Sequence, residues 1–468
     1  MNERPQRVPM ADLDALCAAR PAARGAAPGP AGPSAPAYVG PLARHVREGD
    51  RRLLHLEYDA SPAALRLWSF LLTEEDRLHA ARAAGKTIVG AMKDLGTVPV
   101  MAYALPNVVA FYVDGAWWTP CLMELEEGLF RLADAVGLGD AFCPVRAVVG
   151  AFINRRHFPI PDLLVSSAGA VCDDFSAIAQ RLESLGFPIL WWEMPARRRV
   201  DPGEPAVALP TGFEAPASQV ALVRSELERV RQALADAAGA DLTDARLAEG
   251  IRRANRVRAV LDRLRLLAYT AEPCPMPALE MLIAEMLAIH FCSDQAEAEA
   301  VLADLLAEVS RRADAGSGVL QPGAVRVFWV NPVADLRAMN VLEDCGGRLC
   351  GTEFLFCHTL DPIPEDLPPL EALARTALGD PMVGPSADRA ERIVRDARRF
   401  GAEAVVVSRI PGASHCALEG AVIGEVVRRR LGLPVVEIEV PTVADAVLPG
   451  LRTRLEALVE AALERRKP

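Results

Sequence analysis

Three cysteines of this 468-residue chain occupy comparable places, each shortly before a predicted helix. Cys172 follows an apolar run in LLVSSAGAVCDDF, Cys416 follows another in VVVSRIPGASHC, and Cys143 precedes PVRAVVGAF. The N-terminus of a helix offers free N–H groups and positive potential. We therefore expect lowered pKa values for these thiols, which would let them bind a metal group as thiolates.

The spacing of these cysteines indicates which metal group they suit. Cys172 lies 29 positions after Cys143, and Cys416 lies 244 positions after Cys172, so the ligands would come from separate elements. Zinc sites usually use local pairs such as C-x-x-C, which is absent, as is H-E-x-x-H. Three thiolates suit an iron–sulfur cubane with one iron left open. From the residues alone, the alternative that each thiol is a buried small hydrophobe stays open.

The other cysteines give a weaker signal. Cys345, Cys350 and Cys357 cluster in EDCGGRLCGTEFLFC, whose spacing matches no cluster signature. We predict structural roles for this group, with Cys350 in the core of a strand. Cys121 is undecided. We expect the remaining cysteines to be inert: Cys17, Cys274 and Cys292.

Polar and aromatic residues near the three thiols have two interpretations each. We expect Asp173 and Asp174 to cap a helix beginning at Phe175, and the alternative is support of a bound metal group. His415 is expected to be solvated or hydrogen-bonded, and the alternative is a proton donor. The pair at 191–192, both tryptophan, is expected to pack in the core and at an interface.

The elements that must position these residues alternate between strand and helix. Short apolar runs bounded by Gly, Pro, Asn or Asp predict buried strands, at 86–92, 98–104, 108–113, 163–167, 188–193, 325–330, 349–356, 404–408 and 434–440. Periodic segments predict helices, at 61–85, 122–136, 144–154, 175–185, 390–400, 417–431 and 451–465. This alternation indicates mostly parallel sheets with helices on both faces.

A weak internal repeat relates residues 163–195 to residues 405–441, since each is a strand, a Ser- and Gly-containing loop with a Cys, a helix, Gly-x-Pro and a second strand. The predicted fold class is α/β, with two parallel-sheet domains facing each other. The expected organisation is a flexible, disordered N-terminal arm at 1–60, a first α/β domain at 61–217, a helical segment at 218–314 and a second α/β domain at 315–468.

Composition excludes several classes of function. The formal net charge of -11 disfavours nucleic-acid binding. We expect no transmembrane helix and no secretory signal, and hence a cytoplasmic protein with no membrane partner. The ten cysteines are too sparse for a disulfide scaffold. Since neither a Walker A motif nor G-x-G-x-x-G occurs, this chain is not expected to bind a nucleotide.

Four segments carry a resemblance to a known family: FCPVRAVVGAF, LLVSSAGAVCDDF, the Cys416 loop that continues into RRRLGLPVVEIEVP, and GLRTRLEALVEAAL. Over about residues 86–465 the chain resembles subunits of 2-hydroxyacyl-CoA dehydratases and class I benzoyl-CoA reductases. The resemblance implies two Rossmann-like domains that hold a [4Fe-4S] cluster between them. The matching ligands are Cys143, Cys172 and Cys416, which the residue pattern also singled out.

The resemblance also implies partners and a reaction. Such enzymes are heterodimeric or larger, pair with a homologous second subunit, and receive a low-potential electron from an ATP-dependent activator. The dehydratases pass the electron to the thioester carbonyl of an acyl-CoA, and the ketyl radical lets the β-proton and the 2-hydroxyl leave, whereas the reductases reduce an aromatic ring. The catalytic residues are unknown. Arg197–Arg199 and Arg428–Arg430 are expected to be solvated, and the alternative is contact with CoA phosphates.

Two alternatives to this function remain. A related branch reduces small molecules with a double-cubane cluster, which needs about six cysteines. Cys121, Cys345, Cys350 and Cys357 would then supply the additional ligands. The third hypothesis is a non-catalytic structural subunit of such a complex, which binds its partner and no cluster.

Overall fold

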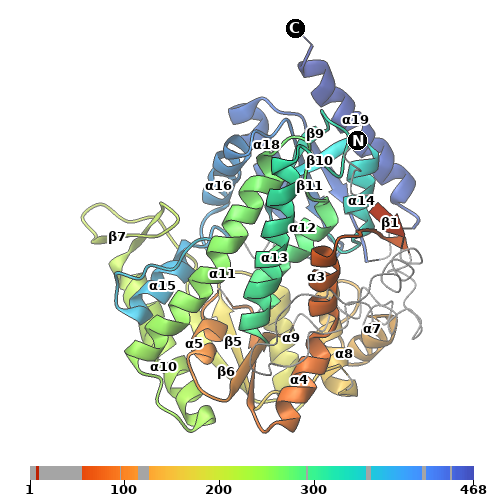
Figure 1. The fold of residues 1–468 in the computed structure, drawn as a ribbon. Coiled ribbons are helices and arrows are strands. Elements are labelled where there is room, and N and C mark those ends of the chain that lie inside the picture. Colours follow the sequence, from red (N-terminus) through yellow and green to blue (C-terminus); the bar gives the residue numbers. More distant parts are fainter. Residues whose placement is uncertain are drawn as a thin grey trace.

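The computed structural model describes residues 7–9, 55–94, 96–113, 126–155, 157–290, 293–354, 360–413, 418–442 and 445–467. Within these ranges the chain forms two four-stranded parallel sheets with helices packed around them, and long helices run along both (Figure 1). The predicted α/β class with two parallel sheets is therefore confirmed. The predicted domain boundaries stay predictions. Of the N-terminal arm, only 7–9 and 55–60 lie within the described residues.

The first sheet has the strand order β4-β3-β5-β6, and all its neighbours are parallel. Its strands are β3 (Thr87–Met92), β4 (Val108–Tyr112), β5 (Leu163–Gly169) and β6 (Ile189–Met194). The helices of this half are α3 (Pro62–Leu72), α4 (Glu74–Ala83), α5 (Val98–Tyr103), α7 (Glu126–Ala135), the 3-10 helix η2 (Pro144–Arg146), α8 (Ala147–Asn154) and α9 (Asp173–Ser184). The central strand β3 is buried because helices cover both faces of the sheet.

The second sheet repeats this plan with the order β10-β9-β11-β12. Its strands are β9 (Val325–Val330), β10 (Gly347–Glu353), β11 (Ala404–Arg409) and β12 (Val435–Glu439). The helices of this half are α14 (Arg337–Asp344), α15 (Pro369–Gly379), α16 (Ser386–Arg399), α18 (Gly420–Leu431) and α19 (Leu448–Arg465). The predicted repeat is confirmed as two parallel βαβ units, β5–α9–β6 and β11–α18–β12.

Four helices lie between or beside the two sheets: α10 (Ala217–Ala238), α11 (Asp244–Thr270), α12 (Ala278–His290) and α13 (Gln295–Asp314). Helix α11 packs against α5 of the first half and against β10 and α15 of the second, so it ties the halves together. The approach to α5 is close, since a Cβ at Gly250 would lie 2.6 Å from the Val100 carbonyl oxygen. A buried ion pair joins Arg265 of α11 to Glu285 of α12 at 2.7 Å.

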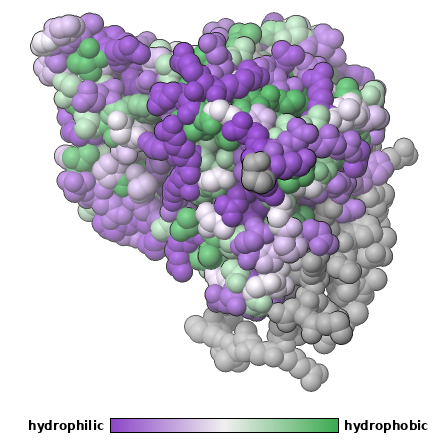
Figure 2. Space-filling view, turned by 90° about the horizontal axis from the view of Figure 1, so that it is seen from above, coloured by the Kyte–Doolittle hydropathy of each residue, from purple (hydrophilic) through white to green (hydrophobic). Residues whose placement is uncertain are grey.

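Two short antiparallel pairs complete the described elements: β1 (Arg7–Pro9) with β2 (Glu57–Asp59), and β7 (Ala206–Ala208) with β8 (Glu214–Pro216). No helix in the described part of the chain is long and apolar enough to cross a membrane. The face in Figure 2 is mostly hydrophilic, with apolar residues scattered among polar ones.

Two predicted elements differ from the structure. The run 98–104, predicted as a strand, forms helix α5, because Asp94 accepts hydrogen bonds from the backbone amides of Thr97 (2.8 Å) and Val98 (3.0 Å) and Pro99 suits a first helical turn. The single helix predicted at 61–85 is two helices, which meet at Thr73 (φ −103°, ψ 12°). Helix α15 was not predicted.

Candidate functional site

The connectivity of the first sheet marks one edge as a binding place. The chain moves from β3 to β4 on one side of β3 and then returns to place β5 on the other side. In doubly wound sheets of this kind, ligands bind outside the carboxyl ends of the strands where the order reverses. Here these strands end at Met92 and Gly169, and the second continues into the loop that carries Cys172.

The loop before Cys172 is held closely by the end of β6. Gly169 has φ +93°, and a Cβ there would lie 2.3 Å from the Met194 carbonyl oxygen. The Ala170 amide donates to the same oxygen at 2.7 Å. Val171 has φ +83°, which a β-branched residue rarely adopts. Strained backbone of this kind persists where the surroundings fix it, and here it adjoins Cys172.

Cys172 is the N-cap residue of α9, and its sulfur lies near the backbone amides of Asp174 and Phe175 without a capping hydrogen bond from them. Burial nevertheless raises the pKa of the Cys172 thiol to about 11, because removal from water outweighs these amides and the nearby Lys93. The prediction of a lowered pKa is therefore wrong for the free thiol. A bound metal ion would reverse this, since a coordinating thiol is deprotonated.

Lys93 lies directly after β3 and has φ +50°. Its Nζ donates to the Gly169 carbonyl oxygen (3.0 Å) and to Ser176 Oγ (2.9 Å), which joins the ends of β3 and β5 to the first turn of α9. Its own carbonyl accepts from Ser167 Oγ at 2.6 Å. Burial lowers the pKa of Lys93, while the attraction of Cys172 and Asp173 opposes that effect. The prediction from sequence missed this residue, although a lysine ending the apolar run TIVGAM was a visible signal.

Cys143 is also placed at a helix start, as predicted, since it is the N-cap residue of η2, which leads into α8. Its backbone amide lies 3.5 Å from Asp174 Oδ1, on the first turn of α9. The Cys143 loop therefore lies beside the helix that Cys172 begins. The side chain of Cys143 is half-buried.

Cys416, the third predicted ligand, and His415 lie outside the described residues. The turn that precedes them is described and approaches the Cys143 loop. Gly412 has φ +80°, and a Cβ there would lie 2.5 Å from the Phe142 carbonyl oxygen and 3.1 Å from that of Asp140. The turn after β11 thus contacts the residues just before Cys143, and this contact joins the two halves.

Within the described ranges, no three His, Cys, Asp or Glu side chains are grouped as metal ligands. The chemistry of the donors that are described fits an iron–sulfur cluster. Two thiols start helices at one edge of the fold, and the Cys172 sulfur lies near the amides of the first turn of α9, a donor set that suits a thiolate-bound cluster. Asp174 faces the Cys143 amide instead of adding a carboxylate ligand.

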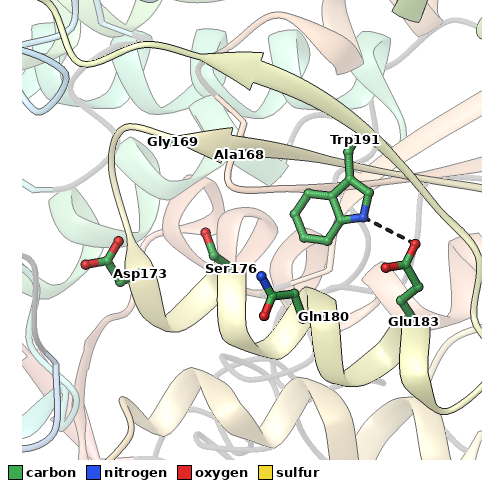
Figure 3. Close-up of a pocket in the computed structure, with 7 residues that line it drawn as sticks. All are labelled: Ala168, Gly169, Asp173, Ser176, Gln180, Glu183 and Trp191. Carbon is green, nitrogen blue, oxygen red and sulfur yellow. Dashed lines mark hydrogen bonds between the residues drawn. The ribbon is translucent and has the colours of Figure 1, made fainter.

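Asp173 and Asp174 differ in their surroundings. Both lie in the first turn of α9, where negative charge is favourable, but Cys172 occupies the N-cap position that the capping prediction gave them. Asp174 is buried, whereas Asp173 lines a cavity of about 440 Å³ between α9 and β6, together with Ser176, Gln180 and Trp191 (Figure 3).

The remaining cysteines lie away from this edge where they are described. Cys350 is buried within β10, as predicted, and burial raises the pKa of its thiol to about 12. Cys345 ends α14 at the amino end of β10, opposite the carboxyl ends that carry the site. Cys274 is buried. The others lie outside the described residues: Cys17, Cys121, Cys292 and Cys357.

The two arginine clusters differ from each other. Arg197 was expected to be solvated but is buried, and it donates to the Leu378 carbonyl oxygen (2.6 Å) and to Asp388 (2.7 Å). It therefore fixes the segment after β6 to the second half. Arg430, in the last turn of α18, is exposed and pairs with Glu391 at 2.6 Å.

Comparison with known protein families shows to which family the chain is similar. A protein-family model described as "2-hydroxyglutaryl-CoA dehydratase, D-component" matches residues 99–461. No curated protein matches the chain. The matched span contains Cys143, Cys172 and Cys416, and it begins after β3 and Lys93.

Proposed function

The chain belongs to the family of the 2-hydroxyglutaryl-CoA dehydratase D-component, and on this premise we propose that it is the iron–sulfur subunit of an enzyme that acts on an acyl-CoA. The proposed ligands of a [4Fe-4S] cluster are Cys143, Cys172 and Cys416. The reaction is of the 2-hydroxyacyl-CoA dehydratase or benzoyl-CoA reductase type. A reducing, cytoplasmic location, which keeps the thiols free for the cluster, is part of the proposal.

The observation that carries the proposal is the meeting of three chain segments. The Cys143 amide faces the first turn of α9, which Cys172 begins, and Gly412 contacts the residue before Cys143. Cys416 follows Gly412 by four positions, and four residues span at most about 14 Å. This short connection from Gly412 supports the proposal that Cys416 joins the other two ligands.

The residues of this chain have definite tasks in the proposal. When bound, the cluster would supply a single low-potential electron to the thioester of the substrate. The amides of Asp174 and Phe175 favour the anionic form of the Cys172 sulfur, although burial outweighs them in the free thiol, and the half-buried position of Cys172 limits its contact with water. The Gly169 loop fixes the position of Cys172 through Met194.

Partners follow from the same premise. The family description names one component of an enzyme, so a further component is expected. We propose a homologous second subunit and an ATP-dependent activator that delivers the electron. The lack of a Walker A motif in this chain agrees with ATP hydrolysis by another protein.

The test is the iron and acid-labile sulfide content of the chain, purified without oxygen after coexpression with its partner subunit. We expect about four irons per chain and absorbance near about 400 nm from iron–thiolate charge transfer. The variants Cys172→Ala and Cys416→Ala should lose both. Cys345→Ala is the matched control. Cys345 is also half-buried, but it lies at the end of α14, just before the amino end of β10 and away from the site.

The outcomes separate the alternatives. Full retention of iron in Cys172→Ala or Cys416→Ala would refute the ligand assignment. About eight irons per chain would indicate a double-cubane cluster, and no iron would indicate a structural subunit. The positions of Cys345 and Cys350 away from the site favour the single cluster.

A further inference from the structure

Lysine is rare in this chain, and one lysine is buried at the proposed site. Of the 51 lysines and arginines, lysine occurs only at positions 86, 93 and 467. Lys93 is 6% exposed, directly after the central strand β3. Burying an ammonium group is costly unless it is compensated, so this position needs a reason.

The described contacts of Lys93 compensate its charge only in part. Nζ donates to the Gly169 carbonyl and to the Ser176 hydroxyl, and an ammonium group has three donors. Among the described residues no carboxylate forms an ion pair with Lys93, whereas buried arginines such as Arg389 and Arg312 have carboxylate partners. One donor and most of the charge are therefore available to another group.

The geometry around Lys93 indicates which group that is. Ser176, which accepts from Lys93, lies in the first turn of α9, and its backbone amide donates to the Cys172 carbonyl oxygen (3.4 Å). Gly169 and Ser176, which Lys93 contacts, stand before and after Cys172 in the chain. The ammonium group thus lies against the segment that carries one proposed cluster ligand.

The second half of the molecule shows that the fold does not need this charge. Asn331 follows β9 as Lys93 follows β3, and it also has positive φ, +68°. Ser408 Oγ donates to the Asn331 carbonyl oxygen (3.0 Å), as Ser167 does to that of Lys93. A neutral residue therefore meets the same backbone requirement, and the cation beside Asn331, which is Arg389, is itself paired with two carboxylates, unlike Lys93.

We propose that Lys93 is a positioning residue that places a fixed positive charge beside the Cys172 sulfur and so stabilises the reduced form of the cluster. This inference rests on the proposed function. A low-potential donor protein would supply the one electron of this reduction, and Lys93 would keep its proton throughout. A nearby cation lowers the free energy of the form with the extra negative charge, more strongly where water is excluded.

The test is a redox titration of the cluster, followed by electron paramagnetic resonance, in the complete complex. Lys93→Asn copies the residue of the second half and tolerates positive φ, and Lys93→Met keeps the side-chain length. At a fixed potential, both should lower the ratio of reduced to oxidised cluster by about tenfold, a shift of about 59 mV for one electron. Iron content should stay at the wild-type level.

Two further variants show whether charge is the cause. Lys86→Asn is the matched control and should leave the redox titration unchanged. Lys86 is exposed and directly precedes β3, at the opposite end of this strand from Lys93. Asp173→Asn removes a negative charge near Lys93 and should shift the potential upward, opposite to the Lys93 variants. A general loosening of the site would not produce shifts of opposite sign.

Each result decides between the inference and its premise. A wild-type chain without iron overturns the proposed function, whereas unchanged potentials in Lys93→Asn and Lys93→Met with full iron overturn only the inference. If both variants lose the cluster, Lys93→Arg decides. Wild-type iron content and potential in Lys93→Arg support the charge, and loss of the cluster or a lowered potential there overturns the inference.

Discussion

The two sheets of this protein share a plan but differ in how they treat buried charge. Both have the same strand order, and in both a serine on the third strand of the unit binds the carbonyl of a positive-φ residue after the central strand. The strand register matches as well. Ser167 of β5 pairs with Trp192 of β6, Ser408 of β11 pairs with Ile438 of β12, and both of these partners are buried.

The charges at this shared position are arranged differently. In the second half, Asn331 accepts a hydrogen bond from Arg389, whose guanidinium also pairs with Glu353 (2.7 Å) and Glu419 (2.7 Å). Burial alone would lower the pKa of Arg389, but these two carboxylates raise it. In the first half, the described partners of Lys93 are a carbonyl and a hydroxyl. In the second half the buried cation Arg389 is paired with carboxylates, whereas in the first half the charge of Lys93 is available for a ligand.

The largest expected effect on stability comes from breaking the buried ion pairs of Arg389 with Glu353 and Glu419. Glu353→Gln leaves the buried Arg389 without the carboxylate that accepts two of its hydrogen bonds and should lower the free energy of unfolding by about 3–5 kcal/mol. Glu439→Gln is the control, because its pair with Arg409 is exposed and should be worth less than about 1 kcal/mol. Chemical denaturation measures both, and equal losses would contradict the stabilising role of the network.

Gly412→Ala tests the contact between the halves. Its Cβ would lie 2.5 Å from the Phe142 carbonyl oxygen and φ is +80°, so we expect a loss of about 2–3 kcal/mol and a reduced iron content. Gly432→Ala has a similar φ of +65° but meets only the flexible Arg465 side chain at 3.8 Å. It should cost about 1 kcal/mol and leave the iron content unchanged. If both variants retain full iron, the Gly412 contact does not help to form the site.

A buried carboxylate outside both sheets shows the effect of a buried negative charge, in contrast to the buried positive charge of Lys93. Burial raises the pKa of Glu280, on α12, to about 8, and repulsion by Asp59 adds to this. Because the folded pKa exceeds the unfolded one, the stabilisation is full below pH about 4.5 and is lost as the pH rises through about 8. Thermal unfolding between pH 5 and 8 should show this decline in the wild type and a weaker one in Glu280→Gln. If the unfolding temperatures of the wild type and Glu280→Gln decline in parallel over this pH range, the decline does not come from Glu280.

The smallest expected effect on stability is that of Lys93→Asn in protein without a cluster. Since the described residues include no carboxylate partner for Lys93, no opposite charge is left unpaired, and the free energy of unfolding should change by less than about 1 kcal/mol. The same denaturation measurement serves here. A loss as large as that of Glu353→Gln would show that Lys93 is part of a structural network, and the contrast between the halves would disappear.

Much of the fold could be predicted from local patterns. Continuous apolar runs bounded by Gly or Pro gave β3, β5 and β9 to within two residues, and the repeat indicated two βαβ units. The run at 98–104 was wrong because a short apolar segment fits a buried strand and a buried helix equally well. Asp94, four positions earlier, decides for the helix by accepting the amides of Thr97 and Val98.

The sequence by itself determined the α/β class, the start of helices at Cys143 and Cys172, and the family to which the chain belongs. Only the tertiary structure decided that Gly412 lies against Phe142, that burial raises the pKa of Cys172, and that the Lys93 ammonium group contacts Gly169 and Ser176 on either side of it. The reason is physical. Local patterns record which residues a helix or strand will bury, whereas the pKa of a thiol and the partner of an ammonium group depend on distant segments that fold against them.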